Sequence, residues 1–172
     1  MPILNKKKYF FDLTYTALNL SMKSINEMNV VLTKYKAKPF IEKEKELFVL
    51  STLLFNQFFI ESVLQHKYWG KYKDYGSMML DLMIEEICNR LKIKDVPSVT
   101  QRYLEIRAIL NDIGRASEEN IPPFFAAAMV YIQATFDEEY TQTFSDETIG
   151  YLYADVSQVF AKLLVDFEKV AK

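Results

Sequence analysis

The chain contains a single histidine, His66, and this scarcity excludes several kinds of metal centre. A ferritin-like di-iron site needs two Glu-x-x-His pairs, and a zinc-protease helix needs His-Glu-x-x-His. Catalytic zinc sites usually carry two or three imidazoles. None of these can be assembled, so we interpret His66 as a helix-end histidine stabilised by nearby carbonyls, with a lone general base beside Glu61 or Cys88 as the alternative.

Cysteine and glycine are equally scarce. Cys88 is the only cysteine, which excludes an intramolecular disulfide or a multi-cysteine zinc site and favours a reduced thiol in the cytoplasm. The adjacent carboxylates Glu85 and Glu86 should raise the pKa of this thiol, whereas a nucleophile needs a lowered one. The four glycines are never clustered, so there is no glycine-rich phosphate loop. We expect no catalytic residues and no cofactor.

A metal-binding acidic loop is also not indicated. Residues 137–139 are acidic, and Asp146 and Glu147 follow after a short interval. The spacing lacks the alternating oxygen donors and the glycine of an EF-hand loop. We interpret these carboxylates as a solvated loop and a helix cap, and we expect no metal site.

Membrane-spanning and secretory segments are not indicated either. The longest apolar stretch is interrupted by Asn56, Gln57 and Glu61, and each polar group would need a partner inside hydrocarbon. The N-terminus has lysines after a short apolar stretch and no small-residue cleavage site after an apolar run, unlike a signal peptide. We therefore expect a cytoplasmic protein.

What the sequence does contain is typical of one packed helical domain spanning residues 1–172. Half of the residues are hydrophobic, with 13 Phe and 11 Tyr. Apolar residues recur at helical spacing in six segments, and no segment reads as a strand. We predict an all-α fold, a compact bundle of about six helices: four over about 6–35, 41–69, 77–92 and 98–114, a fifth with Pro122 and Pro123 in its first turn, and a last one that starts at Ser145.

Helix boundaries follow from capping residues. Ser98 with Gln101 forms a capping-box pattern and predicts the start of the fourth helix, with Gly114 as its end. Gly70 is a candidate left-handed cap after the second helix. Ser145, followed by acidic residues, predicts the start of the last helix.

The second helix, about residues 41–69, is predicted to lie at the centre of the bundle. Aliphatic residues, including Leu53 and Ile60, gather on one side, and Phe48, Phe55 and Phe59 lie on the other. A helix with two apolar sides is normally buried between neighbours. The alanines at 126–128 in the fifth helix allow a close approach, so we place that helix against the second one.

The side of the second helix that carries Phe48, Phe55, Phe59 and His66 has three interpretations. These rings can pack onto the bundle, form the seam of a homodimer, or line a pocket for an apolar or aromatic small molecule between helices. The sequence does not distinguish these three.

The segment after the second helix has the composition of a binding surface. Aromatic residues alternate there with lysines, and the candidate partner-binding residues are Lys67, Tyr68, Trp69, Lys71, Tyr72 and Tyr75. Tyrosine and tryptophan supply rigid contact area, and lysines attract an anionic partner. The alternative is an interhelix turn anchored to the core by its rings. The acidic balance and the absence of a basic recognition helix argue against a nucleic-acid partner.

The charges divide unevenly along the chain. Residues 1–94 carry 15 basic and 10 acidic groups, and residues 95–172 carry 6 and 13. Such an asymmetry can steer a charged partner or favour self-association. Taken together, these features favour a non-catalytic protein-binding module, such as a regulatory, inhibitor or immunity-type adaptor. A carrier or sensor of an apolar small molecule is the alternative.

Overall fold

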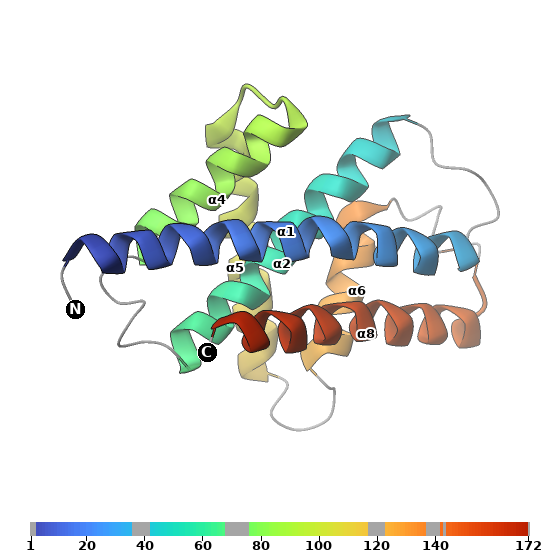
Figure 1. Cartoon of the computed structure of the whole chain (residues 1–172). Coiled ribbons are helices and arrows are strands. Elements are labelled where there is room, and N and C mark those ends of the chain that lie inside the picture. Colours follow the sequence, from blue (N-terminus) through green and yellow to red (C-terminus); the bar gives the residue numbers. More distant parts are fainter. Residues whose placement is uncertain are drawn as a thin grey trace.

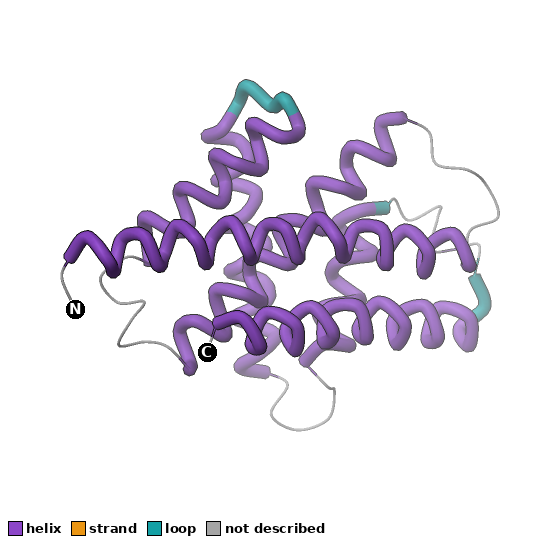
Figure 2. Tube along the Cα trace, viewed as in Figure 1, coloured by secondary structure: helices purple, strands orange, loops and turns teal. Residues whose placement is uncertain are grey.

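The computed structural model describes residues 3–35, 42–67, 76–116, 123–136, 142 and 144–171, and these residues form helices without a strand (Figure 2). The predicted all-α bundle is therefore confirmed. The helices, in chain order, are α1 (Ile3–Tyr35), α2 (Glu42–Lys67), α4 (Gly76–Leu91), α5 (Val96–Ala116), α6 (Pro123–Thr135) and α8 (Asp146–Ala171).

The long helices α1 and α8 lie side by side on one face of the bundle and run in opposite directions (Figure 1). Helix α2 passes behind them, α5 and α6 lie on the far side, and α4 packs against α1, α2 and α5 at the top of the view. Helix α2 contacts each of the other five helices. It is therefore the central helix, as its two apolar sides predict.

Burial of α2 explains its hydrophobic composition. Every side chain from Ser51 to Gln57 is buried, including both polar ends of that stretch. The segment Lys45–Gln65 is long and apolar enough to cross a membrane by length and composition, but 72% of its apolar 18-residue window is buried inside the protein. The core helix of a bundle has the same character, because it must be apolar all round.

The start of α5 differs from the predicted one. The helix begins at Val96, and Asp95 caps it: the backbone amide of Ser98 donates to Asp95 Oδ1 at 3.1 Å and the Ser98 hydroxyl donates to Oδ2 at 2.6 Å. These hydrogen bonds from Ser98 lower the pKa of Asp95. Pro97 falls in the first turn, where a missing amide proton costs little. The helix start that the capping-box pattern at Ser98 predicts is therefore wrong by about one turn.

The predicted end of α5 was also wrong. The helix continues through Gly114 to Ala116, and no glycine in the described ranges has a positive φ. Glycine ends a helix only where the chain needs the left-handed conformation. At Gly114 the backbone stays helical, so the residue acts as an ordinary exposed helix position.

The left-handed cap that the structure does contain is at Lys92, directly after α4. Its φ is 57°, its amide donates to Asn89 O at 3.3 Å, and the Ile93 amide donates to Cys88 O at 2.9 Å. This pair of bonds is the Schellman motif, whose left-handed residue is usually glycine. Lys92 therefore holds a conformation that its β-carbon disfavours.

Replacing Lys92 with glycine should raise the free energy of unfolding by about 1 kcal/mol, because glycine adopts the left-handed conformation without the β-carbon clash. Urea denaturation measures this change. Lys92→Ala is the control, since it removes the charge but keeps the β-carbon, and we expect no comparable gain. Equal stabilisation by both variants would mean that the lysine charge, and not the backbone conformation, is unfavourable.

The last two helices largely follow the sequence prediction. Residues 126–128 of α6 are buried, and α6 packs against α2, as predicted, and also against α8. Ser145 caps α8, since its hydroxyl accepts from the Thr148 amide at 3.2 Å. The apolar side chains on the inner side of α8 are buried from Leu152 to Phe167; at its end Val170 is 51% exposed and Ala171 is buried.

Candidate functional site

The candidate partner-binding segment lies between two described helices. Lys67 is the last residue of α2, and α4 begins at Gly76. The structure does not describe residues 68–75, which include Tyr68, Trp69, Lys71, Tyr72, Tyr75 and the candidate cap Gly70. It describes the backbone of Lys67 but not its side chain.

The two helix ends that bracket this segment are anchored in one hydrophobic cluster. Val63 and Leu64 near the end of α2 are 8% and 2% exposed, and Met79 and Met83 near the start of α4 are 2% and 3% exposed. All four belong to the same cluster, to which α1 and α8 also contribute. Both attachment points of the segment are therefore held by packed helices.

The phenylalanines of α2 are packed within the chain. Phe48, Phe55 and Phe59 are 4%, 0% and 6% exposed. The ring of Phe55 lies 5.3 Å from Tyr131 of α6, and Phe59 lies 5.2 Å from Phe124 and 4.9 Å from Phe160, between ring centroids.

These ring contacts lie where α2 meets α6 and α8, on the side of α2 for which a ligand pocket was one interpretation. Packing onto the bundle, another of the three, accounts for the burial of Phe48, Phe55 and Phe59. His66 lies in the last turn of α2, and its side chain is outside the described ones.

A buried carboxylate, Glu61, forms the centre of a polar cluster that the sequence did not predict. Glu61 Oε2 accepts a short hydrogen bond from the Tyr103 hydroxyl, and Oε1 accepts from Gln65 at 2.9 Å. Arg107 lies 3.1 Å from the same Oε1. Tyr103 is fully buried, whereas about a third of the Arg107 side chain is exposed. The cluster joins α2 to α5.

Gln57 lies one turn before Glu61 and lines a cavity of about 10 Å³ with Met79 and Met83. Neither amide atom of Gln57 has a hydrogen-bond partner among the described residues. A cavity of this size holds about one water molecule. It is too small for a substrate, so we assign this polar cluster to the architecture of the core.

Two further polar contacts join α2 to other helices. Asn56 donates to the Ser24 hydroxyl of α1 at 2.6 Å. Arg102 of α5 donates to the Ser51 hydroxyl and to the Ala134 carbonyl of α6, both at 3.2 Å. The buried polar groups of α2 thus fix its position relative to its neighbours, as hydrogen-bonded groups in a core do.

Cys88 is buried in the core, at 1% exposure. Burial is the larger cause that raises the pKa of its thiol, and the negative charge of Asp95 raises it further. The direction is the predicted one, but the expected cause, the carboxylates Glu85 and Glu86, is not the one found. A protonated, buried thiol is a poor nucleophile.

Among the described residues, no group of three or more His, Cys, Asp or Glu side chains could hold a metal ion. Asp146 and Glu147 lie exposed in the first turn of α8, where carboxylates stabilise a helix N-terminus. The acidic residues 137–139 lie outside the described ranges.

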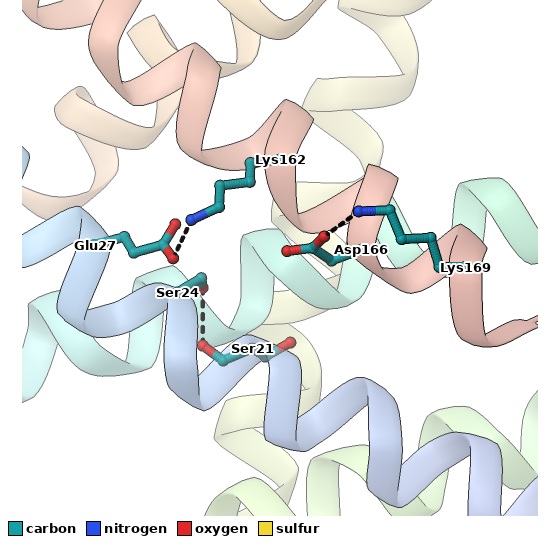
Figure 3. Close-up of polar contacts among 6 residues, drawn as sticks. All are labelled: Ser21, Ser24, Glu27, Lys162, Asp166 and Lys169. Atoms are coloured by element: carbon teal, nitrogen blue, oxygen red, sulfur yellow. Dashed lines mark hydrogen bonds and ion pairs between the residues drawn. The ribbon is translucent and has the colours of Figure 1, made fainter.

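Charged side chains connect the outer surfaces of α1 and α8. Lys162 pairs with Glu27, and within α8 Lys169 donates to Asp166 at 2.9 Å; Figure 3 shows both pairs. The figure also shows the Ser24 hydroxyl donating to the Ser21 carbonyl at 2.8 Å on α1.

At the other end of this pair of helices, Asp155 accepts from Lys34 Nζ at 2.8 Å and from the Tyr35 hydroxyl at 2.7 Å. The Lys34 bond is the main cause that lowers the pKa of Asp155, followed by the Tyr35 bond. Lys34 from the basic half of the sequence is thus paired with Asp155 from the acidic half. Exposed ion pairs of this kind add little stability.

Comparison with protein-family models, with curated proteins and with solved structures found no match.

Proposed function

We propose that the protein is a non-catalytic binding module in the cytoplasm that recognises another protein through residues 67–75. The observation that supports this is the placement of the segment: Tyr68, Trp69, Tyr72 and Tyr75, interleaved with lysines, connect two helices whose ends are held in one hydrophobic cluster. Binding residues are often carried on loops that a rigid scaffold positions.

The chemistry of the segment indicates the kind of partner. Trp and Tyr residues are enriched where truncation costs most binding energy, and lysines around them attract acidic groups. The proposed partner is therefore a protein with an apolar contact surface rimmed by carboxylates. A regulatory, inhibitor or immunity-type adaptor works by such binding and requires no reaction. A second copy of the chain is the other candidate for this surface.

Replacing Trp69 and Tyr72 together with alanine should abolish capture of the partner and leave the helical circular dichroism spectrum unchanged. Tagged wild-type and variant proteins are compared by affinity capture from the native host with mass spectrometry. Tyr151→Ala is the matched control, because it removes an aromatic ring that is 58% exposed on α8.

The proposal predicts that a protein captured by the wild type and by Tyr151→Ala is absent from the double variant. Light scattering gives the molecular mass of the purified wild type and of the purified double variant. A larger mass for the wild type alone would identify self-association through this segment. Equal capture by the double variant and the wild type would exclude residues 67–75 as the binding surface.

A further inference from the structure

A groove of about 440 Å³ lies on the opposite end of α2 from the aromatic segment. One wall is the second and third turns of α2, and the other is the end of α4 with the turn that follows it. Ligand sites in proteins commonly have volumes of about 300–1,000 Å³ and lie between the helices of a bundle. The lining residues are Glu46, Leu47, Leu50, Leu91, Lys92 and Ile93.

The walls of the groove are apolar and fixed in place. Leu50, Leu91 and Ile93 are half-buried and pack with their inner sides against the main hydrophobic core. Leu47 is half-buried and completes the apolar lining. An aliphatic or aromatic group placed here would cover side chains that water now contacts, which favours binding of an apolar body.

Two charges of opposite sign lie on the two walls. Glu46 projects from α2 and Lys92 from the turn after α4, and both are exposed. Neither has an ion pair with any residue that the structure describes. Both charges are therefore available to a ligand in the groove.

The lysine is the unusual one of these two residues. Glutamate at position 46 is an ordinary exposed residue within a helix, whereas Lys92 has a φ of 57° at a position that glycine normally takes. A side chain kept in a disfavoured backbone conformation is a reason to look for a function of that side chain. Lys92 is exposed and also lines the groove.

We propose that this groove binds a small amphiphilic monocarboxylate, with its apolar body on Leu47, Leu50, Leu91 and Ile93 and its carboxylate paired with Lys92. The negative charge of Glu46 on the other wall repels a second anionic group. The ligand is therefore limited to one carboxylate. This site is separate from residues 67–75 and does not depend on the protein-binding proposal.

Decanoate is the probe, with decanol and decylammonium as matched compounds of the same chain length. Binding to the full-length protein is followed by calorimetry and by the methyl resonances of Leu and Ile. Decanoate should bind at one site, shift the resonances of Leu50 and Ile93, and bind more tightly than either matched compound.

Lys92→Gln should weaken decanoate binding about fivefold, the size expected for an exposed ion pair, and leave decanol binding unchanged. Lys94→Gln is the control, since it removes an exposed lysine two residues away that does not line the groove. Leu47→Gln should weaken decanoate and decanol alike, with its fold checked by circular dichroism.

Three results would overturn the proposal. One is equal affinity for decanoate and decylammonium; another is loss of decanoate affinity in Lys94→Gln equal to that in Lys92→Gln. The third is binding to phosphatidylglycerol vesicles without binding to free decanoate, which would assign the groove to a lipid surface instead of a free acid.

Discussion

Replacing Phe55 with alanine should lower the free energy of unfolding by about 3–5 kcal/mol, the range measured for large aromatic deletions in protein cores. The Phe55 ring is fully buried at the centre of α2 and lies 5.3 Å from Tyr131 and 6.0 Å from Phe160, between centroids. It joins α2, α6 and α8 at once. No single one of these helices can move into the space without breaking its other contacts, so the cavity should persist.

Urea denaturation followed by circular dichroism measures this loss. Phe11→Ala is the control, because the same atoms are removed from a side chain that is 39% exposed on α1, and we expect less than about 1 kcal/mol there. Similar losses in the two variants would contradict a core built around α2. A domain of this kind is stable by only about 5–15 kcal/mol, so the Phe55 variant should also unfold at a clearly lower temperature.

The apolar pattern of the sequence was sufficient to predict the helices and the central place of α2. The reason is physical: a helix that is apolar on both sides has only one way to leave water, which is to lie between other helices. The same pattern left the phenylalanine side ambiguous. The same phenylalanines would be needed whether a neighbouring helix, a second subunit or a ligand covered them. Packing within the chain is distinguished only by the contacts that Phe124, Tyr131 and Phe160 make with these rings.

Helix ends were predicted less well, because several residues can cap the same turn. Asp95 and Ser98 are both good N-cap residues, and Pro97 between them is compatible with either start because proline is favoured in the first turn and tolerated before a helix. The left-handed cap fell on Lys92 and not on a glycine, since the Schellman bonds form where α4 must end for Ile93 to pack against the core.

The Glu61 cluster and the α2–α4 groove could not be predicted from the sequence. Glu61 stands out as a charge inside an apolar segment, but its partner Tyr103 lies 42 residues away on another helix. Finding that pair requires the position and rotation of α5 relative to α2. The groove likewise depends on the distance between the start of α2 and the end of α4, which no local pattern specifies.

Replacing Tyr103 with phenylalanine should lower the free energy of unfolding by about 2 kcal/mol, since a hydrogen bond to a charged group contributes about 1.5–3 kcal/mol. The Tyr103 hydroxyl donates to Glu61 in a region with little access to water, and the phenyl ring keeps the shape of the side chain. Urea denaturation of the variant gives the loss directly.

A double-mutant cycle tests whether Tyr103 and Glu61 act as a pair. Glu61→Leu alone should also destabilise, because it removes the acceptor of a buried hydroxyl. The combined variant should lose less than the sum of the two by about 1–2 kcal/mol, since replacing both partners with apolar groups removes the desolvation cost of each. Arg107 is partly exposed and can be solvated in that variant.

Thr52→Val combined with Glu61→Leu provides the control for coupling. Thr52 lies about 13.5 Å from Glu61 along α2 at 1.5 Å per residue and bonds to Tyr131 instead. Its effect should add to that of Glu61→Leu within about 0.5 kcal/mol. Additivity of the Glu61 and Tyr103 changes as well would mean that the hydroxyl and the carboxylate do not interact in solution. The join between α2 and α5 would then depend on apolar packing, the hydrogen bond from Arg102 to Ser51 and the ion pair of Arg107 with Glu61.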